Sequence, residues 1–201
     1  MKLYFVRHGE SEANLLHEFS NRGFKHGLTE RGFQQADQLG LNLHPIPFKK
    51  IYSSPLKRAV QTAETLQQHL NCPLEINDAL REFDTGILEG KSDLESWERH
   101  KWVFDQWLGG NWEARIPGGE SHLDIQARFI PWIESLRQQF TNQNILLVGH
   151  GGLFGSILPL IMTNLEFNSL EEIRIDHTMP IIAEARSDGF YCTQWGKLKY
   201  S

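Results

Sequence analysis

The sequence predicts an α/β fold: a three-layer α/β/α arrangement around a mostly parallel sheet, with a small helical insertion. Short apolar runs alternate with amphipathic stretches along the 201 residues, which is the pattern of strands joined by crossover helices. Two of the runs, residues 3–6 and 144–148, are apolar throughout except for Asn144, which is typical of buried strands. Three polar clusters directly follow expected strands, and α/β sheets bind their ligands at that edge.

The first strand covers residues 3–6, and the first long helix covers residues 29–43 with Thr29 as its N-cap. The helix ends before Pro45, because proline cannot continue it. At helical spacing one face carries Phe33, Ala36, Leu39 and Leu43.

The second strand covers residues 50–53, and a helix follows it through Leu70. We expect Ser54 to cap this helix and Pro55 to take its first position. Residues 74–76 form a short third strand.

The second half of the chain continues the alternation. Residues 119–140 are mostly helical, with a bend or restart near Pro131. The strand at residues 144–148 runs straight into a glycine-rich turn and another helix. Two or three short strands are expected between residues 173 and 195.

Residues 92–117 differ from the rest because tryptophan recurs there every five residues, a spacing that forms no single helical stripe. A better stripe consists of Trp97, Phe104 and Leu108, with Trp102 on another face. This helical segment either packs on the core or forms a cap-like wall over the active site, and both can hold together. We expect residues 1–201 to form a single domain that contains this insertion.

The composition excludes several classes of protein. A net charge of −5 disfavours a protein that coats nucleic acid, and no apolar stretch reaches the ~18 residues of a membrane span. Cys72 and Cys192 form no zinc or CxxC pattern, so we expect both to be reduced, as in a cytoplasmic protein. A chain of this length needs no metal or disulfide to support its core. Exposed tryptophans in the insertion could make a homodimer contact.

The polar clusters carry groups suited to phosphate chemistry. His8 follows the first strand, and a neutral imidazole is a nucleophile near neutral pH. Arg58 lies in the first turn of its helix, where free N–H groups and a guanidinium favour an anion. His150 stands between glycines that leave room for a ligand. Each also has an ordinary interpretation: a surface loop, an exposed arginine, or an imperfect dinucleotide-binding loop.

An acidic loop at residues 80–90 follows the third strand and contains Glu82, Asp84 and Glu89. One of these carboxyls could protonate a leaving-group oxygen, although a solvated turn has the same composition. The sequence Gly90-Lys91-Ser92 only superficially suggests a P-loop, because Thr85 stands in place of the first glycine and no buried strand precedes the loop.

Together these segments resemble the histidine phosphatase superfamily, also called phosphoglycerate-mutase-like. The motifs occur in family order: RHGES at 7–11 with Asn14, LTERGFQQA at 28–36, SSPLKRAVQTAETL at 53–66, LREFDTGILEG at 80–90, PGGES at 117–121 and VGHGG at 148–152. The resemblance covers residues 1 to about 165, with the C-terminal strands matching more loosely.

The resemblance implies a role for each matching residue. His8 would be the nucleophile that becomes phosphohistidine, and Glu82 would be the general acid and base. Arg7, Arg58 and His150 would surround the phosphoryl group, with Asn14 and Gly151 also binding it. Ser20 stands where the family often has a substrate-contacting serine, although residues 21–27 depart from the usual loop. The resemblance implies no metal and no cofactor.

The resemblance leaves three functions open. A phosphomonoesterase acting on a small phosphorylated metabolite is favoured, because the segment after Gly90 is short and lacks the basic, proline-rich run of the mutases. A cofactor-dependent phosphoglycerate mutase and a catalytically silent relative that binds a phosphorylated ligand are the alternatives. Intact Arg7, His8, Arg58, Glu82 and His150 argue against the silent relative.

Overall fold

The computed structural model describes residues 1–23, 25–165 and 175–200, and its centre is one seven-stranded sheet in the order β3-β2-β4-β1-β5-β6-β7. The strands are β1 Lys2–Arg7, β2 Phe48–Ser53, β3 Leu74–Ile76, β4 Asn144–Gly149, β5 Ile181–Arg186, β6 Gly189–Trp195 and β7 Leu198–Lys199. The helices are α1 Glu12–Leu16, α2 Glu30–Leu43, α3 Lys57–Leu70, α4 Leu94–Leu108, α5 His122–Gln139 and α6 Gly151–Ile161, with short 3-10 turns η1 Asp78–Leu80 and η2 Gly86–Leu88.

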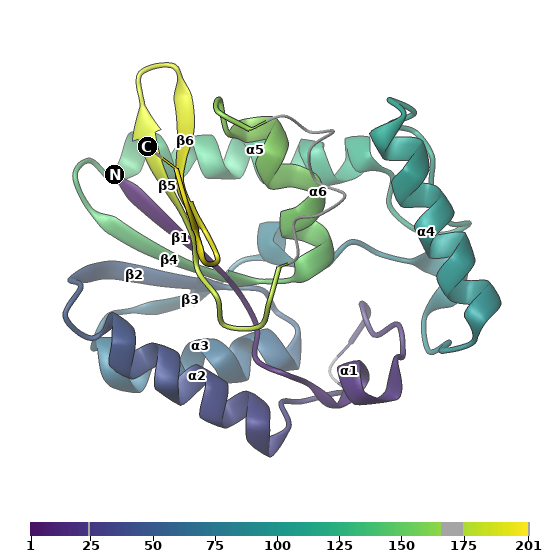
Figure 1. Cartoon of the computed structure of the whole chain (residues 1–201), viewed down its shortest axis with the longest axis horizontal. Helices are drawn as coiled ribbons and strands as arrows, with labels where there is room; N and C mark the ends of the chain where they lie inside the picture. Colours follow the sequence, from purple (N-terminus) through teal and green to yellow (C-terminus); the bar gives the residue numbers. More distant parts are fainter. Residues whose placement is uncertain (24, 166–174, 201) are drawn as a thin grey trace.

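The four strands β3, β2, β4 and β1 are parallel, and β5 to β7 continue the sheet in antiparallel fashion. Helices cover both faces of the sheet, with α2 and α3 on one side and α5 and α6 on the other (Figure 1). The predicted three-layer α/β fold with a mostly parallel sheet is therefore confirmed.

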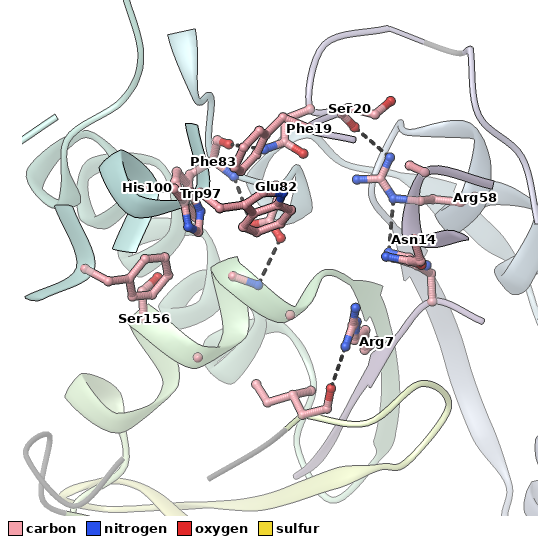
Figure 2. A pocket seen from close by; sticks show the side chains of 18 of the residues that line it. Arg7, Asn14, Phe19, Ser20, Arg58, Glu82, Phe83, Trp97, His100 and Ser156 are labelled. Atoms are coloured by element: carbon pink, nitrogen blue, oxygen red, sulfur yellow. Dashed lines mark hydrogen bonds between the residues drawn. The ribbon is translucent and has the colours of Figure 1, made fainter. Parts of the chain in front are cut away.

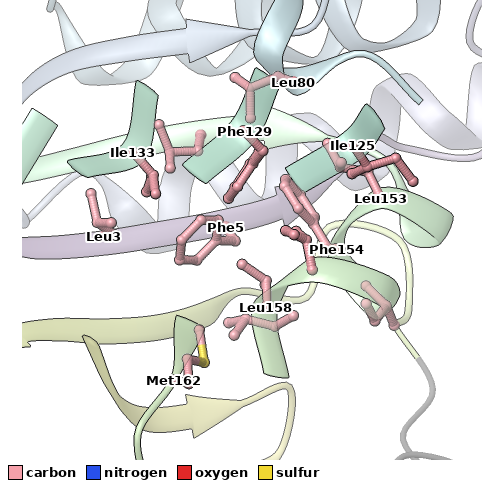
Figure 3. Packing of buried hydrophobic residues seen from close by; sticks show 14 of the residues in the cluster. Leu3, Phe5, Leu80, Ile125, Phe129, Ile133, Leu153, Phe154, Leu158 and Met162 are labelled. Carbon is pink, nitrogen blue, oxygen red and sulfur yellow. The ribbon is translucent and has the colours of Figure 1, made fainter. Parts of the chain in front are cut away.

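Strand β1 is apolar at residues 3–6 because it is buried on both faces of the sheet. Leu3 and Phe5 point into the core beneath α5 and α6, whereas Tyr4 and Val6 point into the core beneath α2 and α3. All four side chains are buried, because successive residues of a strand face opposite sides of the sheet. Figure 3 shows the first of these cores, where Phe5 packs against Phe154 edge to face. The strand is thereby fixed from both faces up to its carboxyl end.

The predicted boundaries of the long helices need two corrections. Thr29 caps α2 as expected and accepts a hydrogen bond from the Gly32 N–H, but Ser54 does not cap α3. Residues 54–56 form a turn in which the Leu56 N–H donates to Ser54 Oγ, and the helix begins only at Lys57. The helix predicted from residue 119 begins at His122, because Ser121 caps it and Gly118–Gly119 belong to the preceding turn.

The buried face of α2 is also rotated from the predicted one. Phe33 is 40% exposed, whereas Gly32 and Gly40 are buried beside Ala36, Leu39 and Leu43. The reason is close packing: a Cβ on Gly40 would lie 2.3 Å from the ring of His69 on α3. Gly40 thus allows α2 and α3 to pack closely, and Phe33 lies on the exposed side of α2.

The insertion contains one helix, α4, which lies at the edge of the molecule beyond α6 (Figure 1). Trp102, which was placed on another face than the predicted stripe, is exposed. Trp107, absent from the predicted stripe, is fully buried. Among the strands expected between residues 173 and 195, β5 and β6 are present, and residues 173 and 174 lie outside the described part of the chain.

Cys72 and Cys192 are buried and form no disulfide. Within the described ranges, no helix combines the length and apolarity needed to cross a bilayer.

Candidate active site

A cavity of about 430 Å³ lies at the carboxyl ends of β1, β4 and β2, next to α4 (Figure 2). Its wall includes most of the predicted site residues: Arg7, His8, Asn14, Ser20, Arg58, Glu82 and Gly151. These residues come from positions far apart in the sequence and meet because parallel strands end at one edge of the sheet.

His8 follows β1 and is held in one tautomer. Its Nδ1–H donates to the Gly9 carbonyl at 2.7 Å, so Nε2 carries the lone pair and accepts from Arg58 Nε at 3.0 Å. Burial, reinforced by the charges of Arg58, His150 and Arg7, holds the pKa of His8 well below its usual value. The imidazole is therefore neutral at neutral pH, with its nucleophilic nitrogen beside two guanidiniums.

Arg58 is the second residue of α3 and is almost completely buried. Its Nη1 donates to the Ser20 carbonyl at 2.7 Å, which fixes the guanidinium between His8 and the loop before α2. Burial lowers its pKa to about 10, so the group stays charged at neutral pH. A charged guanidinium at a helix N-terminus is suited to bind phosphate.

Arg7 precedes His8 and is tied to residues just outside the sheet. Its Nη1 donates to the Ile175 carbonyl at 2.8 Å, and its own carbonyl accepts from the Thr178 N–H. His177 donates from Nδ1 to the His8 carbonyl at 2.7 Å. The segment before β5 therefore positions the backbone of both Arg7 and His8.

His150 follows β4, and its ring lies 5.1 Å from that of His8 between centroids. Its Nε2 lies 2.7 Å from Ser54 Oγ, and no hydrogen bond joins its buried Nδ1 to another described residue. Burial and the charges of the nearby arginines hold the pKa of His150 well below its usual value, so its ring is neutral at neutral pH. The ring is wholly buried and is not among the described residues that line the pocket.

Glu82 lies at the N-terminus of α6. Its carboxylate accepts from the N–H groups of Leu153 at 2.6 Å, Gly152 at 2.9 Å and Phe83 at 3.1 Å. Burial raises its pKa, against the opposing effect of these donors and of the Arg58 charge. Glu82 is thus a half-buried carboxyl in the pocket wall with a raised pKa.

Three further predicted residues line the pocket. Asn14 Oδ1 accepts from the N–H and the hydroxyl of Ser11, which directs the amide NH₂ away from that contact. Ser20 is buried and binds Arg58 through its carbonyl rather than its hydroxyl. Gly151 begins α6, and a Cβ there would lie 3.2 Å from Arg7 Nε.

The acidic loop is supported by two ion-pair and hydrogen-bond networks. Glu89 accepts from the N–H groups of Asn21 and Arg22, and so connects the acidic loop to the segment before α2. Glu120 pairs with Arg128 at 2.9 Å, and Arg128 also donates to the Arg81 carbonyl. These contacts fix the backbone on either side of Glu82.

Sequence reasoning missed two neighbours of the histidines, Ser54 and His177. Ser54 was assigned to helix capping, and the sequence carries no signal that a residue 96 positions from His150 contacts it. His177 follows no motif. His100 on α4 was also missed; it lies in the pocket wall among aromatic rings.

No cluster of three or more potential ligands for a metal occurs among the residues whose placement is described. The charged groups at the carboxyl edge of the sheet are instead two arginines and one carboxylate around a neutral histidine, an arrangement suited to an oxyanion.

Fold and site together define a histidine phosphatase, and the chain belongs to the histidine phosphatase superfamily (branch 1), whose family model matches residues 3–197. The match extends beyond the residues 1–165 that carried the resemblance in the sequence. Family membership supports a hydrolase that acts on phosphate esters.

Individual relatives carry different names. The protein named "Putative phosphoserine phosphatase 2" of Hydrogenobacter thermophilus is 35% identical over 88% of this chain and 85% of its own. The protein named "Probable phosphoglycerate mutase GpmB" of Salmonella choleraesuis is 32% identical over 81% of this chain and 75% of its own. Among solved structures, Bacillus stearothermophilus YhfR superposes with a TM-score of 0.83 at 26% identity and covers 98% of both chains.

Proposed function

We propose that this protein is a phosphomonoesterase that hydrolyses a small phosphorylated metabolite through a phosphohistidine on His8. The observation that carries the proposal is the state of His8: a neutral imidazole whose Nε2 lone pair faces a charged Arg58 at 3.0 Å. Phosphoryl transfer depends mainly on positioning and charge stabilisation, and this site supplies both.

In the first step, Nε2 of His8 forms a bond to phosphorus while the bond from phosphorus to the ester oxygen breaks. Protonated Glu82 gives its proton to that departing oxygen, which leaves as an alcohol. The approach of an anionic phosphate raises the pKa of the Glu82 carboxyl further, because like charges disfavour ionisation. The substrate thus promotes the protonated form that the step requires.

In the second step, water attacks phosphorus and the electron pair of the N–P bond returns to Nε2 of His8. The Glu82 carboxylate takes a proton from the attacking water, and inorganic phosphate leaves. Arg7 and Arg58 stabilise the negative charge in both steps.

An assay with p-nitrophenyl phosphate tests the proposal. Wild-type protein is expected to release phosphate, and His8→Ala to lose at least about a thousandfold in kcat/KM, because it lacks the nucleophile. Equal rates for the two proteins would contradict the enzyme and favour a silent phosphate-binding relative.

The phosphoglycerate mutase alternative has the support of the Salmonella relative's name. A mutase and a phosphatase share the first step and differ in whether a second substrate hydroxyl or water accepts the phosphoryl group. Incubation with 3-phosphoglycerate and its bisphosphate separates them. Phosphate release faster than isomer formation supports the phosphatase, and the reverse order supports the mutase.

A further inference from the structure

The pocket has a second half, which is built of rings. Six side chains, here called the aromatic subsite, line it: Phe19, Phe83, Trp97, His100, Phe104 and Trp107. Figure 2 shows Phe19, Phe83, Trp97 and His100 together, on the opposite side of the pocket from Arg7 and Arg58. Most of these rings come from α4 and face the phosphate end across Glu82.

The rings hold one another in place. Centroid distances are 4.2 Å for Phe19 and Trp97 and 5.5 Å for the stacked rings of Phe83 and His100. His100 and Phe104 are 5.2 Å apart. Trp97 is also anchored through its indole N–H, which donates to the His17 carbonyl at 2.9 Å. The subsite is therefore a preformed apolar wall of planar groups.

Among the described lining residues, positive charge is confined to the other half of the pocket. Among the described residues that line the pocket, the cations are Arg7 and Arg58, both at the phosphate end. Glu18 is the remaining charged residue apart from Glu82, and Lys25 and His26 bind it. Burial lowers the pKa of His100 to about 4, so this ring is neutral at neutral pH. A second anionic group on a substrate would meet no cation in the aromatic subsite as described.

From this arrangement we infer that the substrate is the phosphomonoester of an uncharged alcohol bearing a planar aromatic ring, which stacks in the aromatic subsite. The inference rests on the proposed function for the reaction but concerns the leaving group alone. Phosphoserine and phosphoglycerate carry a carboxylate in their leaving group and are therefore poor substrates. The names of two relatives contain phosphoserine and phosphoglycerate, but we do not infer either compound as the substrate of this pocket.

Binding of uncleavable phosphonates to the wild-type protein tests the subsite without relying on catalysis. The probes are 3-phenylpropylphosphonate, 3-cyclohexylpropylphosphonate, pentylphosphonate and 2-amino-4-phosphonobutyrate, compared by calorimetry. We expect the phenyl compound to bind at least about tenfold more tightly than pentylphosphonate and more tightly than the cyclohexyl compound. The carboxylated compound is expected to bind most weakly. Equal affinities, or tightest binding of the carboxylated compound, would overturn the inference.

Trp97 and Trp102 form a matched pair of variants on α4. Trp97 lines the pocket, whereas Trp102 is 54% exposed and lies outside it. Trp97→Leu is expected to reduce the preference for the phenyl over the pentyl phosphonate at least about fivefold, and Trp97→Phe to retain most of it. Trp102→Leu should leave the preference unchanged. The same loss in both leucine variants, or in neither, would overturn the inference.

Phosphate release from the matching esters distinguishes failure of the subsite from failure of the proposed function. If no ester is hydrolysed while the phenylphosphonate preference persists, the phosphatase is contradicted and the subsite stands. If all esters are hydrolysed at similar rates without a binding preference, the phosphatase stands and the subsite is contradicted. 2-Phenylethyl phosphate and butyl phosphate suit this comparison, because both release primary alcohols.

Discussion

His8 is prepared as a nucleophile by contacts that the backbone supplies. The Gly9 carbonyl fixes the tautomer, the Gly149 carbonyl accepts the His8 N–H, and His177 holds the His8 carbonyl. No carboxylate is needed to orient the ring, in contrast to a serine–histidine–aspartate triad. A carboxylate there would raise the pKa of His8, whereas the arginines and the burial lower it.

The role of Glu82 predicts a dependence on the leaving group. In Glu82→Gln the alkoxide leaves without a proton, so kcat/KM for an alkyl phosphate should fall by at least about a hundredfold. An aryl phosphate, whose phenolate leaves unaided, should lose less than about tenfold in the first step. Parallel steady-state assays with 2-phenylethyl and p-nitrophenyl phosphate check this, and an equal loss for both would contradict the acid role.

At the residue scale the sequence predicted the identity of the site residues better than the contacts that those residues make. Arg7, His8 and Arg58 are readable because a strand end and a helix start place them at one edge of the sheet. Glu82 was distinguished from the other carboxyls of its loop only by the resemblance to the family. The partners Ser54 and His177 are not readable, since each meets its histidine only through tertiary packing. The complete burial of the His150 ring also depends on tertiary packing.

At the scale of single elements, the N-terminus of α6 couples Glu82 to the fold. Two N–H groups in its first turn bind the carboxylate, and Gly152 permits the approach. A Cβ at Gly152 would lie 2.8 and 2.9 Å from the two Glu82 oxygens and 2.7 Å from the Phe83 ring. The glycine is required by this contact rather than by its backbone angles.

Gly152→Ala is therefore expected to displace Glu82 and to destabilise the protein by about 1–3 kcal/mol. Its activity should show the leaving-group dependence of Glu82→Gln, which a loss of stability alone would not produce. Gly155→Ala is the stability control on the same helix, because its Cβ would meet only Ile175 Cδ1 at 3.8 Å. Urea unfolding of both variants measures the effect. Equal free energies of unfolding for Gly152→Ala and Gly155→Ala would contradict the requirement for glycine at position 152.

Element boundaries could be predicted where a local signal sets them and not where packing does. Thr29 caps α2 through its own hydroxyl, a contact within four residues. Ser54 offers the same hydroxyl, but its contact with His150 and the turn at 54–56 shift the start of α3. The buried face of α2 depends on the close approach of α3 at Gly40. The burial of Trp107 depends on the loop after α4, where the Ala114 carbonyl accepts a hydrogen bond from the Trp107 indole N–H.

For the whole molecule, buried neutral histidines predict a loss of stability in mild acid. As pH falls below about 6.5 the unfolded chain binds protons at its histidines, whereas folded His100 and His177 bind them only near pH 4. Unfolding therefore becomes more favourable across that window. Each such group lowers the free energy of unfolding by at most ~1.4 kcal/mol per pH unit.

The substitution His100→Phe keeps an aromatic ring at this position and removes one of the imidazoles that bind a proton on unfolding. Between pH 7 and pH 5 the free energy of unfolding of this variant should fall by about 1–2 kcal/mol less than that of the wild type. Urea titrations at the two pH values give the comparison. An identical fall in both proteins would mean that His100 titrates normally in the folded state.

The charges that bind phosphate belong to arginine side chains of the chain itself, so the reaction is expected to need no added metal. Dialysis against EDTA should leave kcat and KM for p-nitrophenyl phosphate unchanged. Loss of activity that Mg²⁺ or Zn²⁺ restores would contradict the proposed stabilisation of the phosphoryl group.

Formation of phosphohistidine on His8 tests the central claim most directly. Wild-type protein mixed with a phosphomonoester and denatured in alkali within milliseconds should carry one phosphoryl group, on the peptide that contains His8 and in an acid-labile linkage, as detected by mass spectrometry. The His8→Ala protein should carry none. Turnover of the ester with no phosphoryl group on His8, or with the group on another residue, would contradict the account.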